Sequence, residues 1–227
     1  MFIIFKLEFF KLQKKLRAWL GPILVFLLIT ISFPLTVELA SDDLKNVFYS
    51  VLWIASLLTV MVSVEGIFLE DYEDGTLENF SVTNDSLFSM VLMKIFIYWL
   101  LIGIPISLLG TFFSISMSGQ ISSLNVALPA MLISTYIFIN LFSLGNSLSL
   151  NKGSVLGALI TMPLLFPILI LLGKIVLNAN FGFEIYNLLL LMLGVLLLII
   201  VFIPFILMTL VVSILLLMFI CIYTIYR

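Results

Sequence analysis

The sequence contains no histidine, and Cys221 is the only cysteine among its 227 residues. Histidine is the commonest general base and a frequent ligand of zinc and haem iron, so the usual means of holding a haem is missing. A single cysteine excludes an intramolecular disulfide. The nucleotide-binding pattern G-x-x-x-x-G-K-[ST] is also absent. Any work driven by ATP therefore needs a separate ATPase, and this chain is predicted not to be an enzyme.

Charged residues are scarce as well, at 10% of the sequence, whereas hydrophobic residues make up 63%. Soluble domains carry about 25% charged residues, and a chain this apolar cannot cover a surface that faces water. The sequence therefore predicts an all-α integral membrane protein. Because one span takes about 20 apolar residues, we expect about six transmembrane helices in a single transmembrane permease domain over residues 1–227.

Interruptions of the apolar runs predict where these helices lie. The expected spans are 22–37, 47–69, 87–117, 124–150, 154–177 and a last one that begins near 188, with an apolar run that continues to 226. Residues 2–20 precede them and place Phe5, Phe9, Leu12, Leu16 and Trp19 on one helical stripe, with basic residues off it. This pattern is typical of an amphipathic helix that lies in the membrane interface.

Lysine and arginine are distributed unevenly between the two sides of this topology. With the N-terminus inside, the inner side holds Lys6, Lys11, Lys14, Lys15, Arg17, Lys94, Lys152 and Arg227, and the outer side holds Lys45 and Lys174. This bias predicts that both termini face the cytoplasm or the mitochondrial matrix. Lys94 lies near the start of the third span and is expected to snorkel to the interface. Glu65, near the inner end of the second span, is expected to reach water.

The most polar segment is the stretch E-D-Y-E-D-G-T-L-E at residues 70–78, within an inner loop at 70–86 that joins the second and third spans. A segment this polar is expected to face water. It can act as a coupling helix that docks on a partner's ATPase, because Gly75 breaks the run, Thr76 can cap a helix and Leu77 offers an apolar anchor. The candidate docking residues are Glu70, Asp71, Asp74, Gly75, Thr76, Leu77 and Glu78. A solvated loop without a partner fits the composition equally well.

Two further interpretations of this stretch involve metal ions. An EF-hand is excluded, since Tyr72 and Ser81 would occupy the third and twelfth ligand positions of the calcium loop. Asp71-x-x-Asp74-Gly75 resembles the start of the CDP-alcohol phosphotransferase motif, but the later residues of that motif are missing. We therefore predict no metal site. Within the spans, the candidates for helix kinks or a transport pathway are Gly103, Pro105, Pro163 and Pro167.

Several segments together resemble the CcmB family, the B subunit of the haem-handling ABC transporter of cytochrome c maturation. Residues 70–78 are similar to the family signature D-x-x-D-G-[ST]-L-E. Trp99-x-x-x-Gly103-x-Pro105 is similar to its third span, Pro163-Leu164-x-x-Pro167 to its fifth and Ile203-Pro204-Phe205 to its last. Where the family often has His-Trp in the third span, this chain has Tyr98-Trp99.

The resemblance implies an ABC-2-type permease subunit, in which a partner's ATP hydrolysis drives haem delivery or the release of a haem-loaded chaperone. The implied partners are the ATPase, a haem-binding C-type membrane subunit, a small single-span subunit and the haem chaperone, with two copies of this chain in each complex. The implied location is a bacterial or mitochondrial inner membrane. We expect no cofactor on this chain alone, haem only through the complex, and contact with lipids but not nucleic acid. The alternative is an ABC-2-type permease that exports a lipid, glycan or drug.

Overall fold

A computed structural model describes residues 2–37, 42–76, 87–118, 124–150, 154–181, 185–203 and 206. The described part contains no strand, which confirms the predicted all-α fold. Its helices are α1 (Phe2–Lys14), α2 (Leu16–Thr36), α3 (Asp42–Val64), α4 (Leu69–Glu73), α6 (Leu87–Tyr98), the π-helical turn η1 (Trp99–Gly103), α7 (Ile104–Ser118), α8 (Leu124–Leu148), α9 (Ser154–Phe181) and a last helix, Ile185–Ile203.

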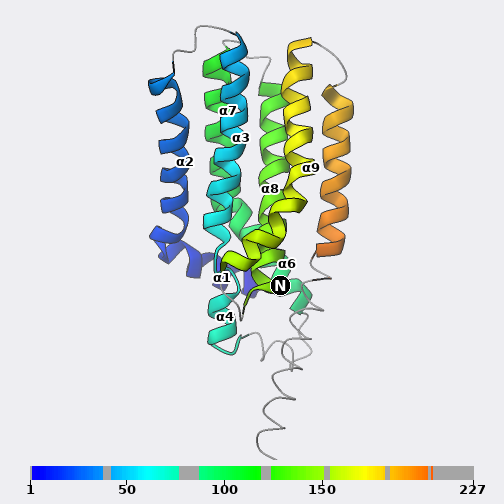
Figure 1. The fold of residues 1–227 in the computed structure, drawn as a ribbon. Coiled ribbons are helices and arrows are strands. Elements are labelled where there is room, and N and C mark those ends of the chain that lie inside the picture. Colours follow the sequence, from blue (N-terminus) through cyan, green and yellow to red (C-terminus); the bar gives the residue numbers. More distant parts are fainter. Residues whose placement is uncertain are drawn as a thin grey trace, which may run out of the picture.

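The long helices stand side by side as a bundle, while α1, α4 and α6 lie at its lower end (Figure 1). Five segments are long and apolar enough to cross a membrane, and α9 adds a shorter apolar segment, Leu159–Ile175. The five are Trp19–Thr36, Val47–Glu73, Ser89–Met117, Leu124–Leu148 and Ile185–Ile203. The protein is thus a multi-pass membrane protein, and five of the six predicted spans match these segments, while the predicted fifth span matches the shorter apolar segment of α9.

Helix α8 lies at the centre of the bundle and packs against α3, α7 and α9. Its buried side chains include polar ones, and the Thr135 hydroxyl lies 3.1 Å from that of Ser107 on α7. The outer helices instead expose large apolar side chains such as Leu28 and Leu190. This distribution suits a bundle in lipid, where small and polar residues join the helices and apolar residues face the hydrocarbon.

The N-terminal helix is shorter than predicted. It ends at Lys14, because Lys15 adopts a non-helical backbone conformation with φ −91° and ψ 65°. Leu16 and Trp19, which continue the apolar stripe in sequence, belong to α2. The chain therefore turns at Lys15 from the foot of the bundle into the first span (Figure 1).

The third span is continuous but irregular at its middle. Pro105 has no amide hydrogen to offer the preceding turn, and just before it the Ile104 N–H bonds to the Trp99 carbonyl, five residues back. Gly103 lies against the Trp99 indole, since a Cβ at this position would come within 2.5 Å of the ring. Gly103 and Pro105 therefore lie at a helix irregularity, and their predicted role in a kink or a transport pathway stays a prediction.

The two prolines of the fifth span lie inside α9 without ending it. Both Pro163 and Pro167 are exposed at the surface of this chain. A pathway that used them would therefore run along the outside of α9, against lipid or a partner, and that role too stays a prediction.

Candidate functional site

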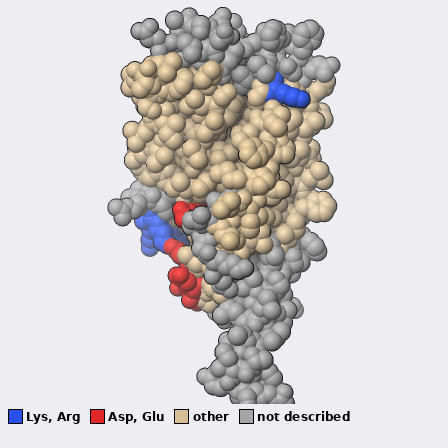
Figure 2. Space-filling view, in the orientation of Figure 1, with Lys and Arg blue, Asp and Glu red and all other residues tan. Residues whose placement is uncertain are grey.

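Most of the charged side chains that the structure describes gather at one end of the molecule. In the view of Figure 2, red and blue atoms cluster at the lower left of the coloured part of the surface, and one basic side chain lies near its top. The elements at that lower end are α1, α4 and α6 (Figure 1). This is the two-sided distribution on which the orientation was predicted, and it brings Glu70 and Asp71, at the start of the polar stretch, together with the basic N-terminal helix.

A tight turn joins the second span to α4. Helix α3 ends at Val64, and Gly66 follows with φ 75°, a left-handed conformation that is costly for residues with a side chain. On α8, the Asn146 side-chain amide donates a hydrogen bond to the Val64 carbonyl at 3.0 Å. The fourth span therefore holds the end of the second span, directly before the chain turns into α4.

Helix α4 carries the first part of the predicted docking stretch and ends as the sequence indicated. The Asp74 N–H donates to the Glu70 carbonyl at 2.9 Å, and Gly75 follows with φ 69°. Gly75 thus ends the helix in the left-handed conformation that a glycine adopts most easily. Thr76 is the last described residue here, so its expected cap stays a prediction. Leu77 and Glu78, with the rest of the loop up to 86, lie outside the described residues.

Asp71 is the centre of an ion-pair network. Its side chain is buried, and its two carboxylate oxygens accept hydrogen bonds from the ammonium groups of Lys94 and of Lys11, the latter at 3.0 Å. Lys94 is itself only 4% exposed, with the Glu8 carboxylate 3.9 Å from its Nζ and the Phe68 ring 5.8 Å away. Three elements, α1, α4 and α6, therefore meet at one carboxylate.

These positions correct two predictions. Asp71 does not face water, and Lys94 does not snorkel to the interface, because each is buried against the other. Burying a single charge is very costly, but a buried pair with further hydrogen bonds offsets much of the lost hydration. Glu65 is exposed, as expected.

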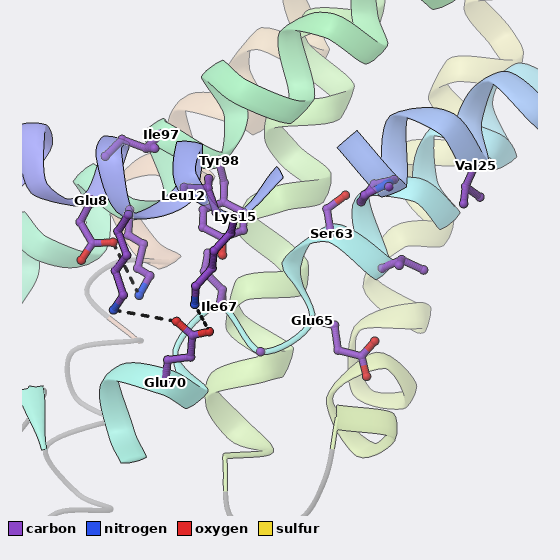
Figure 3. A pocket seen from close by; sticks show the side chains of 16 residues that line it. Glu8, Leu12, Lys15, Val25, Ser63, Glu65, Ile67, Glu70, Ile97 and Tyr98 are labelled. Atoms are coloured by element: carbon purple, nitrogen blue, oxygen red, sulfur yellow. Dashed lines mark hydrogen bonds and ion pairs between the residues drawn. The ribbon is translucent and has the colours of Figure 1, made fainter. Parts of the chain in front are cut away.

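Glu70 extends the network to the surface. Its carboxylate pairs with Lys15, which lies at the break between α1 and α2, and lies 3.9 Å from the Lys11 ammonium (Figure 3). Burial acts to lower the pKa of Lys11, but its hydrogen bond to Asp71 and the carboxylates of Asp71, Glu8 and Glu70 outweigh burial, so its pKa is raised. Lys11 therefore stays charged, and α1 is tied to α4 at two adjacent acidic residues.

Comparison with known proteins identifies the family of this chain. The family model described as "CcmB protein" matches residues 2–214 of this chain. The chain belongs to the CcmB family. Curated relatives in this family carry the name "Heme exporter protein B". The relative from Pseudomonas aeruginosa is 32% identical over 153 residues, which cover 66% of this chain and 69% of the relative. The relative from Haemophilus influenzae is 30% identical over 185 residues, which cover 79% and 84%.

For this CcmB-family chain, sequence reasoning identified Asp71 but missed its partners Lys11 and Lys94, and it missed the Glu8 carboxylate that lies near Lys94. One signal was available, because Lys94 stands alone in a long apolar run, and a charge in such a run usually has a partner. Nothing local points to Asp71 as that partner, since 23 residues separate the two. Among the described residues, no group of three or more histidine, cysteine or acidic side chains is placed to hold a metal ion.

Proposed function

We propose that this chain is the permease subunit of an ABC complex that exports haem for cytochrome c maturation. The observation that carries the proposal is its membership of the CcmB family together with relatives named as heme exporter subunits. The 227-residue sequence contains no G-x-x-x-x-G-K-[ST] motif, so hydrolysis of ATP is assigned to a separate subunit. Haem ligation is assigned to a C-type membrane subunit, since this sequence has no histidine.

The remaining parts of the complex are proposed from the resemblance to the family. A small single-span subunit and a haem chaperone complete the set of partners, and two copies of this chain sit in each complex. ATP hydrolysis then drives either haem delivery or the release of the loaded chaperone. The complex lies in a bacterial or mitochondrial inner membrane, with the charged end of this chain on the cytoplasmic or matrix side, as the lysine distribution favours.

Docking of the ATPase is assigned to residues 70–78. Glu73 and Asp74 are exposed on α4 and offer negative charge to a partner, and Glu78 adds to it in sequence. Asp71 is buried, so its contribution is to hold α4 in place, not to touch the partner. Glu70 is exposed and pairs with Lys15, so it contributes both to holding α4 in place and to the contact with the ATPase.

The same contacts give a route by which closure of the ATPase would move the spans. A push on α4 reaches the third span through the Asp71–Lys94 pair and reaches α1 through Lys11. It reaches the fourth span through the hydrogen bond from Asn146 to the Val64 carbonyl. Buried polar contacts transmit displacement better than a solvated loop does. They therefore favour docking of the ATPase over the alternative, a solvated loop without a partner.

Removal of this chain tests the cargo. In a host that lacks the gene for its own CcmB-family protein, we expect c-type cytochromes without covalent haem. Expression of this chain together with its partner subunits is expected to restore haem staining. Normal haem staining in the deletion would overturn the proposal and favour export of a lipid, glycan or drug. The measurement is haem staining of denatured membrane proteins, with total haem content as the control for haem synthesis.

Charge reversal tests the docking surface. The triple variant Glu73→Lys, Asp74→Lys, Glu78→Lys is expected to lose most ATPase in co-purification, because it replaces three negative charges of the proposed docking stretch by positive ones. Lys174→Glu, an exposed reversal in α9 at the opposite end, is the matched control and should keep the ATPase. Equal recovery of the ATPase with both variants would rule out docking at this stretch.

A further inference from the structure

A pocket of about 410 Å³ lies beside the ion-pair network. Helix α1 and the start of α2 form one wall, and the end of α3, the turn at Gly66, α4 and α6 form the other (Figure 3). Its volume lies in the range of small-molecule sites, which is roughly 300–1,000 Å³. It lies where the N-terminal helix meets the spans, so its position is that of the boundary between lipid headgroups and hydrocarbon.

The charges that line this pocket are balanced. Its basic side chains are Lys11, Lys15 and Lys94, and its acidic ones are Glu8, Glu65 and Glu70. Each of these lysines already has a carboxylate partner. A purely anionic ligand would therefore have to compete with those carboxylates, whereas a ligand with one positive and one negative group would not disturb the balance.

Two charged side chains that line the pocket at opposite sides are exposed at the surface. The Lys15 side chain is 44% exposed, and its ammonium has three donors, so its bond to Glu70 leaves others available. Glu65 is exposed and lies across the pocket from Lys15 in Figure 3. A phosphate at Lys15 and an ammonium group at Glu65 would each face a group of opposite charge.

The rest of the lining is apolar and leads toward the spans. Val25 on α2 and Val62 on α3 are 40% and 51% exposed, and both belong to segments that can cross a membrane. Leu12 and Ile97 also line the pocket, and both side chains are buried in the protein. A ligand bound here by its charged end would thus have an apolar path along α2 and α3 for its hydrocarbon part.

We propose that this pocket holds the headgroup of a zwitterionic phospholipid with a primary ammonium group, such as phosphatidylethanolamine. The phosphate accepts hydrogen bonds from Lys15, the ammonium group donates to Glu65, and an acyl chain lies along Val25 and Val62. The bound lipid then fills the space between α1 and the first two spans and holds α1 against α4. The assignment is independent of which cargo the complex moves.

Lipid retention by the purified complex tests this assignment. The complex is exchanged into nanodiscs of phosphatidylethanolamine and phosphatidylglycerol, extracted in mild detergent, and the retained lipids are identified by native mass spectrometry. We expect preferential retention of phosphatidylethanolamine, and about tenfold weaker retention in Lys15→Gln and in Glu65→Gln, since a charge-assisted contact is worth about that much. Addition of inorganic phosphate should not displace the lipid.

A second pair of variants leaves every charge in place. Val62→Trp fills the apolar end of the pocket and is expected to abolish retention, whereas Leu58→Trp, also exposed on α3 but outside the pocket lining, should retain the lipid. Equal retention by Val62→Trp and Leu58→Trp would overturn the proposal. So would equal retention of phosphatidylglycerol, displacement by phosphate alone, or a partner subunit found cross-linked to position 62 in place of lipid.

Discussion

Replacing Asp71 by asparagine is expected to destabilise the protein by about 3–5 kcal/mol, the range found when one partner of a buried ion pair is removed. Asparagine keeps the shape of the side chain but removes its charge. Lys94 would then remain buried, and among the described residues its remaining ion-pair partner would be the Glu8 carboxylate at 3.9 Å. The measurement is the free energy of unfolding in mixed micelles, or the shift in the midpoint of heat unfolding if the transition is irreversible.

Two further variants make this result specific. Glu73→Gln removes an acidic charge from the same short helix, but at an exposed position, and should change stability by no more than about 0.5 kcal/mol. Lys94→Met in the Asp71→Asn background removes the stranded ammonium, so the double variant should be more stable than Asp71→Asn alone. An Asp71→Asn protein as stable as Glu73→Gln would mean that the network does not hold the fold together.

The double variant also separates folding from force transmission. If Asp71 and Lys94 carry motion from α4 to the third span, Asp71→Asn with Lys94→Met should recover stability without recovering cytochrome c assembly. Full recovery of haem attachment would assign the pair a purely structural role. The proposed ATPase docking at Glu73 and Asp74 would be untouched by that outcome, because those side chains are exposed and lie outside the pair.

The spans could be predicted from sequence because the physical requirement behind them is local. A helix must supply about 20 consecutive apolar residues to cross the hydrocarbon, and such runs are visible without any knowledge of packing. The irregularity near Gly103 and Pro105 was predictable for the same reason, since a proline removes a backbone donor wherever it stands. Gly75 likewise ends α4 through a backbone preference of its own.

The ion-pair network could not be predicted in the same way. Lys11, Asp71 and Lys94 come from three helices, with 60 and 23 residues separating the paired positions. The polarity of residues 70–78 predicted that the whole segment faces water. Asp71 is buried instead, because its carboxylate pairs with Lys11 and Lys94. The break between α1 and α2 at Lys15 could not be predicted for another reason: the apolar stripe of α1 continues in sequence into α2.

Larger side chains at the contact between α8 and α9 are expected to have an effect at least as large as that of Asp71→Asn. A Cβ on Gly145 would lie 2.4 Å from the Gly157 carbonyl oxygen, and one on Gly157 would lie 2.5 Å from the Gly145 carbonyl oxygen. Backbone atoms on both sides leave nothing flexible to move aside. Gly145→Leu or Gly157→Leu must therefore separate two helices that pack along their length.

We expect either leucine variant to fail to accumulate in the membrane as a folded monodisperse protein, and the alanine variants to be destabilised by about 1–3 kcal/mol, as in other overpacked cores. Gly173→Ala is the matched control, because it lies on the same helix α9 and an added Cβ meets nothing within 4 Å there. Size-exclusion profiles and heat-unfolding midpoints would measure both effects. Since glycine lowers helix stability, Gly173→Ala should be neutral or slightly stabilising, and Gly157→Ala of equal stability would show that α8 and α9 are not in backbone contact.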